Sequence, residues 1–306
     1  MTKRILMMAV VVGTLFSCEE DVDPNKVDDV IDSLEDVTNN PSSCKLMKVE
    51  STDDDNDKST WTYTYDNDGN LTQWEDVYSS SDGDVYTEGL KFTYSSMLPV
   101  TASYYDLDYP DDAFDIDIDW SGSDLTKVSF SYEEDGQEAT WELKFLYSGG
   151  KLNKVEAWSN EYYDENTEEV TIGDLYIDEV YEITFTGENI SKIVSTDYED
   201  GSTSELSYTE TITYSGYDSK INPFRGDIAT LLWDDNWAGF FSANNVGSVT
   251  DVEKAYEDGT VTEEWEESYD YTYTYNDKDL PTTIKEVEMW DGSTYTTDLT
   301  LTYDCN

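Results

Sequence analysis

The sequence contains no histidine, 3 cysteines and 6 prolines in 306 residues. The lack of histidine removes the commonest general base and the commonest ligand of transition metals. It also excludes a Ser-His pair, and no glycine-rich phosphate loop is present, so no acid–base pair stands out and we expect a protein that is not an enzyme. The catalytic alternative is a glycoside-active enzyme, which needs two carboxylates about 5 to 10 Å apart.

Basic residues are scarce, since 17 Lys and Arg stand against 70 Asp and Glu, for a formal net charge of −53. This balance excludes a nucleic-acid partner, because affinity for nucleic acid depends on neutralising phosphates with cations. The same charge repels anionic lipid headgroups and attracts divalent cations. Disorder is not expected, because 25 Tyr, 9 Trp and 9 Phe supply ample apolar area.

The N-terminus holds an apolar run, from Ile5 to Phe16, after Lys3 and Arg4. It is shorter than the roughly 20 residues of a membrane-spanning helix and is typical of a cleaved secretory signal. Leu15-Phe16-Ser17-Cys18 resembles a bacterial lipobox, in which the cysteine is acylated, with palmitate for example, and becomes the new N-terminus. The resemblance implies a signal peptide over 1–17 and a membrane anchor on Cys18. The alternative is an ordinary signal with a chance cysteine.

Three acids, Glu19, Glu20 and Asp21, follow Cys18 directly. They resemble the surface-export signal of lipoproteins in the Bacteroidota, which implies the outer membrane and its cell-surface face. The alternative is an acidic tether without an address. Residues 18–44 are expected to form this tether, with one short amphipathic helix, because apolar residues recur at helical spacing over 27–37.

From Cys44 onward the period of the apolar residues changes to two. Stretches such as "WTYTYD", "GLKFTYS" and "YDYTYTY" put aromatic residues on one face and polar residues on the other. This alternation is typical of an antiparallel sheet with one wet face. Asp-Gly pairs between such runs predict hairpins.

A second turn recurs, in which an aromatic residue precedes a Leu or Ile by five positions. The pairs are Trp120 and Leu125, Tyr147 and Leu152, Phe185 and Ile190, and Tyr275 and Leu280. Tandem units of this kind predict an antiparallel meander of about 14–16 strands over residues 45–306. The segment 217–245 breaks the pattern and predicts one short helix, starting near Asp227, or a packed apolar loop that covers or fills the sheet.

These motifs, with "YDSKINPF" at 217–224, resemble a family of Bacteroidota surface lipoproteins that carry a domain of unknown function described as porin-like. The resemblance covers most of the chain from Cys44 to Cys305 and implies a barrel or a strongly curved sheet. It does not imply a pore, because a lipid-facing barrel needs an apolar outer band, and the second face here is Thr, Glu, Asp and Ser.

Cys44 and Cys305 flank the domain and are expected to form a disulfide in an oxidising compartment. A bond would place the two ends of the meander side by side, so that the sheet curls back on itself. The alternative is two unpaired buried thiols in an open, twisted sheet.

Two kinds of ligand site remain open. The stretches "DDDND" and "DNDGN" partly resemble calcium loops, in which Asp53, Asp55, Asp57, Asp66 and Asp68 would supply oxygen ligands. Solvated hairpin loops are the simpler interpretation. Trp158 and Trp290 lie at expected hairpin ends and could form platforms for a glycan, or could pack across strands. We therefore expect a lipid-anchored envelope protein that acts as a binding or adhesive module for glycan or protein. The alternative is a structural envelope lipoprotein with no small ligand.

Overall fold

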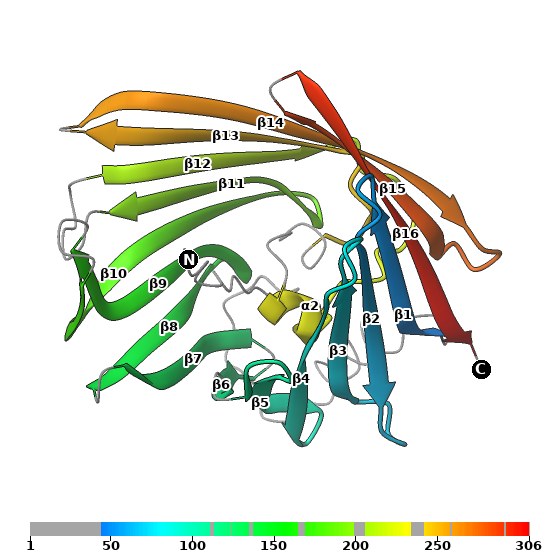
Figure 1. Ribbon diagram of the computed structural model, residues 1–306, viewed down its shortest axis with the longest axis horizontal. Helices are drawn as coiled ribbons and strands as arrows, with labels where there is room; N and C mark the ends of the chain where they lie inside the picture. The colour runs from blue at the N-terminus through cyan, green and yellow to red at the C-terminus, as the bar shows by residue number, and fades with distance from the viewer. Residues whose placement is uncertain are drawn as a thin grey trace.

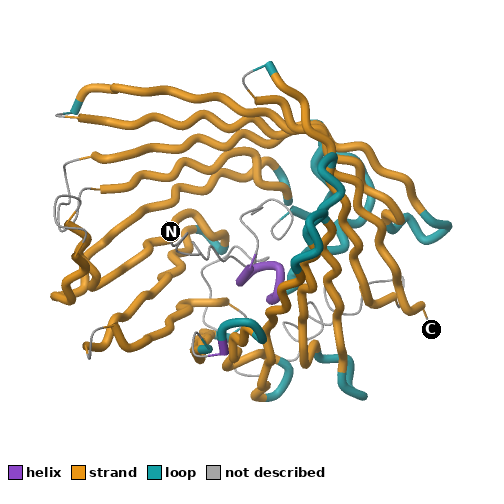
Figure 2. Tube along the Cα trace, in the orientation of Figure 1, coloured by secondary structure: helices purple, strands orange, loops and turns teal. Residues whose placement is uncertain are grey.

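The computed structural model describes residues 44–110, 113–122, 124–134, 137–164, 169–198, 206–233, 242–257, 259–290 and 292–305. Sixteen antiparallel strands follow one another around a closed barrel, in which β1 pairs with β16 (Figures 1 and 2). The predicted all-β meander is confirmed, and its curvature is that of a barrel. The signal peptide predicted over 1–17 and residues 18–43 of the tether predicted over 18–44 lie outside the described residues, whereas Cys44 already belongs to the first strand.

The strands differ in length, from 8 residues in β2 to 18 in β10. Their bounds are β1 Cys44–Asp53, β2 Lys58–Tyr65, β3 Leu71–Ser79, β4 Val85–Ser95, β5 Leu98–Asp106, β6 Phe114–Ser121, β7 Asp124–Glu134, β8 Gln137–Ser148, β9 Lys151–Asp164, β10 Glu169–Thr186, β11 Asn189–Tyr198, β12 Leu206–Ser215, β13 Ser248–Glu257, β14 Thr260–Tyr275, β15 Pro281–Trp290 and β16 Ser293–Cys305. One helix, α2 Ile228–Trp233, lies between β12 and β13.

The recurring aromatic residue of the sequence marks a recurring β-bulge. In six strand pairs the register shifts next to the turn that joins the two strands. The shift comes immediately before Tyr65, Tyr94, Trp120, Tyr147, Phe185 and Tyr275. A bulge bends its strand and increases the local twist. The repeated bulge therefore helps to curve the meander until its two edges meet.

Aromatic side chains at this end of the barrel, three of them at bulges, also tie each unit to its neighbour. Their polar atoms donate hydrogen bonds to backbone carbonyls on the adjoining strand pair: Tyr65 to Leu46 (3.0 Å), Trp120 to Pro99 (2.7 Å), Tyr147 to Leu125 (3.0 Å), Tyr217 to Ile190 (2.7 Å), Tyr273 to Val246 (2.8 Å) and Tyr303 to Pro281 (2.8 Å). Burial raises the pKa of Tyr65, Tyr147 and Tyr303, so these hydroxyls remain donors. The bonds form a ring at one end of the barrel.

The insertion between β12 and β13 fills this end, which we call the plugged end. Ile228, Ala229, Leu231 and Leu232 of α2 are buried in the same apolar core as the strands, and Figure 1 shows α2 enclosed by them. The carboxylate of Asp227 accepts a hydrogen bond from the backbone amide of Ala229 at 3.0 Å, as a helix cap does. The predicted helical insertion that fills the sheet is thus confirmed.

The opposite end, which we call the mouth, is where the odd-numbered strands end and the even-numbered strands begin. The inner and outer faces follow from the register, because paired residues share a face. Near the plugged end the inner face is apolar, with Val49, Leu90, Ile193 and Leu301 buried. Towards the mouth the inner face becomes polar and acidic.

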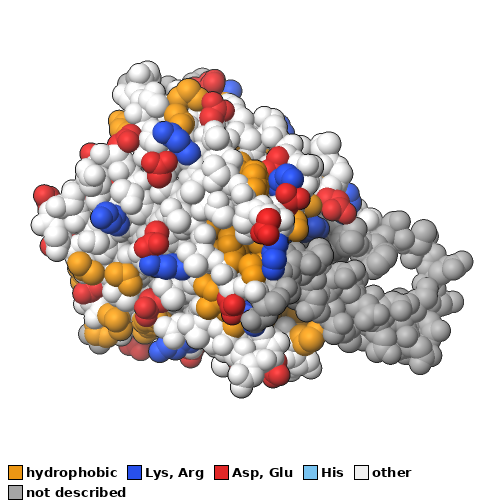
Figure 3. Space-filling model, turned by 90° about the vertical axis from the view of Figure 1, so that its right-hand side faces the viewer, with side chains coloured by type: hydrophobic (Ala, Val, Ile, Leu, Met, Phe, Trp, Pro, Cys, Tyr) orange, Lys and Arg blue, Asp and Glu red, His pale blue; other side chains and the backbone are white. Residues whose placement is uncertain are grey.

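The outer face is polar along the strands. On β14, for example, the outward residues Glu264, Glu266, Ser268, Asp270, Thr272 and Thr274 alternate with inward residues, most of which are aromatic. Figure 3 shows one side of the barrel as a mixture of acidic, basic and other polar side chains with scattered apolar ones. Such a face favours contact with water, whereas a lipid-facing barrel presents an apolar outer band.

Candidate functional site

Strands β12 to β15 carry acidic side chains on the inner face between the apolar core and the mouth. The buried Val249 identifies this face, because it pairs with Tyr214 and Tyr269, and Asp251 and Glu253 follow it at two-residue steps along β13. The same register places seven acids on the inner face: Glu263, which lies nearest the mouth, and six that we call the acidic wall, namely Glu210, Asp251, Glu253, Glu267, Glu286 and Glu288.

Three members of the acidic wall lie close enough to interact directly. Among the described residues, Glu210, Asp251 and Glu253 are the one group of three acids whose carboxylate oxygens lie within 4.8 Å of one another. Burial, and then the charge of Asp251, raises the pKa of Glu210. Burial likewise raises the pKa of Asp251, to which Glu210 is hydrogen-bonded. Both shifts favour protonation of this pair, which avoids two adjacent buried charges.

Acids continue onto the neighbouring strands β10 and β11. Glu179 is 4% exposed and accepts hydrogen bonds from the hydroxyls of Tyr181 and Ser195. Burial, followed by the charge of Glu179, raises the pKa of Asp197 to about 7. Asp197 is therefore partly protonated near neutral pH.

Aromatic side chains accompany the acids at the mouth. Trp265, Trp290 and Tyr295 face inward, yet they are 37%, 45% and 45% exposed. Each lies directly opposite a carboxylate on the next strand: Trp265 opposite Glu253, Trp290 opposite Glu267 and Tyr295 opposite Glu288. Side chains in such positions have Cβ atoms about 5 Å apart. Aromatic rings and carboxylates therefore alternate on a solvent-accessible inner surface.

The two tryptophans singled out from the sequence lie on opposite faces of the barrel. Trp290 belongs to the inner aromatic group, whereas Trp158 lies on the outer face of β9, opposite Glu142. The ammonium group of Lys144 lies 3.8 Å from the ring centroid of Trp158, so this ring face is already occupied. The two rings cannot form one platform. The inner acids and Trp265 were missed because only the register brings them together.

The aspartates predicted for calcium lie in two turns at opposite ends of β2. The carboxylate of Asp53 accepts backbone hydrogen bonds from Asp55 and Asp57, at 3.0 and 2.9 Å. Asp66 accepts them from Asp68 and Asn70, both at 2.9 Å. These oxygens stabilise hairpin turns, and the same arrangement recurs at Asn276, which accepts from Lys278 and Leu280.

Calcium binding by these loops stays a prediction and can be measured. We expect calcium at 10 mM to raise the free energy of unfolding by about 1 to 3 kcal/mol, given the dissociation constants of 0.1 to 1 mM typical of extracellular sites. Thermal unfolding with calcium, and with sodium chloride at equal ionic strength, checks this. The variants Asp55→Asn and Asp68→Asn should abolish the calcium-specific part. Equal stabilisation by sodium would reveal screening alone.

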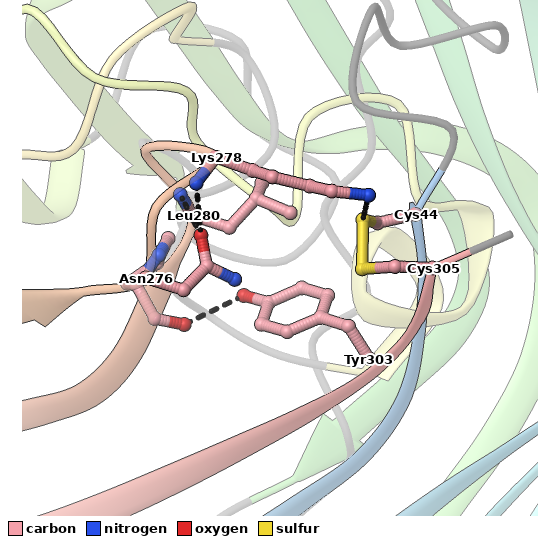
Figure 4. The surroundings of a disulfide bond; sticks show 7 residues. Cys44, Asn276, Lys278, Leu280, Tyr303 and Cys305 are labelled. Atoms are coloured by element: carbon pink, nitrogen blue, oxygen red, sulfur yellow. Dashed lines mark hydrogen bonds between the residues drawn. A yellow bond between two sulfur atoms is a disulfide. The ribbon is translucent and has the colours of Figure 1, made fainter.

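A disulfide joins Cys44 to Cys305 where the barrel closes, and their Cα atoms are 4.1 Å apart although the residues are 261 positions apart in sequence (Figure 4). Next to it, the Lys278 ammonium lies 3.3 Å from the sulfur of Cys44, and Tyr303 donates to the Pro281 carbonyl. The bond therefore fastens β1 to β16 at the plugged end. Cys18, the predicted lipidation site, lies outside the described residues.

Comparison with solved structures places porin-like proteins among those similar to this barrel. A porin-like protein from Bacteroides uniformis shares 14% identity over 85% of this chain and 96% of its own, with a TM-score of 0.49. One from Bacteroides vulgatus shares 10% identity over 85% and 98%, with the same TM-score. No protein-family model matches the chain, and no curated protein matches its sequence, so membership of a lipoprotein family stays a prediction.

None of the helices among the described residues has the length and apolar character needed to cross a bilayer.

Proposed function

We propose that the protein is a lipid-anchored binding protein of the bacterial envelope, exposed at the cell surface, which admits its ligand to the inner face of the barrel through the mouth. It binds without catalysing a reaction. A glycan is one fitting ligand class, because aromatic rings beside carboxylates suit the apolar face and the hydroxyls of a sugar.

The exposed inner aromatic group carries this proposal. Trp265, Trp290 and Tyr295 face the lumen but are accessible to water, whereas the inner face at the other end is filled by α2. Exposed aromatic side chains beside convergent polar groups are characteristic of binding sites. The alternative is a purely structural envelope lipoprotein, in which these exposed rings bind no ligand.

Attachment through lipid is supported by the polar outer face and by the lipobox-like sequence at Cys18. We expect Cys18→Ala to move the protein from the membrane fraction to the soluble fraction, because several acyl chains anchor firmly and their loss leaves an acidic, water-exposed barrel. Fractionation and membrane flotation measure this. Flotation of the variant with the outer membrane would place the anchor elsewhere.

Surface exposure is tested separately. Replacing Glu19, Glu20 and Asp21 together by Ala should leave the protein in the membrane but reduce its cleavage by protease added to whole cells. Unchanged cleavage would remove these acids as the export signal.

The location of the binding site is tested with matched tryptophan variants. Glycans and small molecules are screened for a shift in melting temperature, and each hit is repeated with Trp290→Ala and Trp158→Ala. We expect hits to lose their shift with the inner variant and to keep it with the outer one. No hits, or hits that depend on Trp158 alone, would contradict an inner binding site.

A further inference from the structure

The outer face of the barrel holds a group of three side chains: an aromatic ring, a carboxylate and an ammonium group. The inner face repeats the ring and the carboxylate. Trp158 on β9 lies opposite Glu142 on β8. Lys144 completes the group, with its ammonium 3.8 Å from the Trp158 ring centroid and 3.2 Å from a carboxylate oxygen of Glu142. A cation over an indole ring and beside a carboxylate gains from both contacts.

The inner face repeats the ring and the acid without the ammonium. Trp265 lies opposite Glu253, Trp290 opposite Glu267, and Tyr295 opposite Glu288. The strands that form this wall, β12 to β16, contain two lysines, and the register turns both outward. Lys254 forms an ion pair with Glu264 at 3.1 Å on the outer face, and Lys285 lies opposite Thr272.

The charge of the inner wall is therefore not balanced by the strands that carry it. Burial, and then the charge of Glu267, raises the pKa of Glu288, and burial raises that of Glu286. A nearby cation would lower the pKa of both carboxyl groups and so favour their ionised form. These three aromatic residues remain 37% to 45% exposed, so part of each is accessible to a ligand.

We propose that three acids of the acidic wall, Glu253, Glu267 and Glu288, bind a slender oligoamine together with the rings of Trp265, Trp290 and Tyr295, so that each ammonium group lies between a ring and a carboxylate. The proposal rests on the inner binding site described above and assigns its ligand class. Successive ring–acid pairs are displaced by one strand, about 4.8 Å, and by two residues along it, about 6.8 Å, so they lie roughly 8 Å apart. Ammonium groups joined by short alkyl linkers fit this repeat, and a single ammonium fills only one pair.

Calorimetric titration of the purified full-length protein with spermine tests the proposal. We expect saturable binding that weakens at least tenfold in Trp290→Ala and in Glu267→Gln, because each substitution removes one of the two groups that contact the same ammonium. The matched outer variants Trp158→Ala and Glu142→Gln should change the affinity less than twofold. Trp290→Phe keeps a ring and should retain most of the affinity, and melting curves confirm that each variant is folded.

Competition experiments separate this ligand class from the others. Butylamine should bind far more weakly than spermine, and magnesium at equal ionic strength should not displace it. Spermine binding that is insensitive to the inner variants, or equal displacement by magnesium, would overturn the proposal. So would a lysine-rich peptide that binds tighter than spermine, which would assign the wall to a polypeptide. If spermine fails to bind while a neutral oligosaccharide binds and depends on Trp290, the inner site stands and the amine assignment falls.

Discussion

Replacing Cys44 and Cys305 together by serine is expected to lower the free energy of unfolding by up to about 5 kcal/mol. The disulfide closes a loop that spans 261 positions, and the entropy that such a crosslink removes from the unfolded chain grows with loop length. It also secures the pairing of β1 with β16, which joins the two ends of the meander. Denaturant unfolding of the variant and of the wild type, oxidised and reduced, measures the effect.

A cysteine outside the barrel provides the control. Cys18→Ser should leave the unfolding midpoint of the barrel unchanged, and reduction should destabilise the wild type as much as the double substitution does. A loss below about 1 kcal/mol would mean that strand pairing alone holds the barrel closed, with the unfolded state already compact.

The barrel is expected to be more stable at pH 5 than at pH 8, with Asp197 as a large contributor. Its pKa is raised in the folded protein from 3.8 to about 7, so its proton favours folding. This stability is fully present below about pH 4 and is lost as the pH rises through 7. The shift of about three units corresponds to roughly 4 kcal/mol at pH 8, and Glu210 and Asp251 shift in the same direction.

Replacing the carboxyl group of Asp197 by an amide should remove most of the free-energy cost of ionising this buried group at pH 8. Asp197→Asn is expected to stabilise the protein at pH 8 by a few kcal/mol and to flatten the dependence between pH 4 and 7. Asp117→Asn, at an exposed outer position of β6, is the matched control and should have little effect. Urea unfolding at intervals of one pH unit provides the measurement. A destabilising Asp197→Asn would show that the carboxylate makes a favourable ionised contact.

Much of the barrel follows from local patterns in the sequence. Period-two alternation and the aromatic residue before each turn predict strands and turns because both signals depend on neighbours in the chain. The change of period after Tyr217 likewise predicts the insertion, since α2 has its own apolar face. The closed form depends on a contact between Cys44 and Cys305, which the sequence could only suggest from the position of two cysteines.

The candidate site was hidden for a physical reason. In "TEEWEES", acids occupy both faces of β14, so hydrophobic alternation gives no phase there. The register resolves the phase, because Glu267 pairs with Asp251 and faces inward while Glu264 pairs with Lys254 and faces outward. Pairing of Trp290 with Glu267 also joins separate strands, and such cross-strand neighbours are not visible in a single sequence.

The position of Cys44 would also orient the barrel relative to the anchor proposed on Cys18. The described chain enters β1 at the plugged end, beside the Asn276–Leu280 turn, and the mouth lies at the far end of the strands. An anchor on Cys18 would reach the barrel through residues 19–43, on the side of α2 and the disulfide. The mouth would then open away from the bilayer. A ligand arriving from the medium would meet Trp290 and its neighbours before any part of the apolar core.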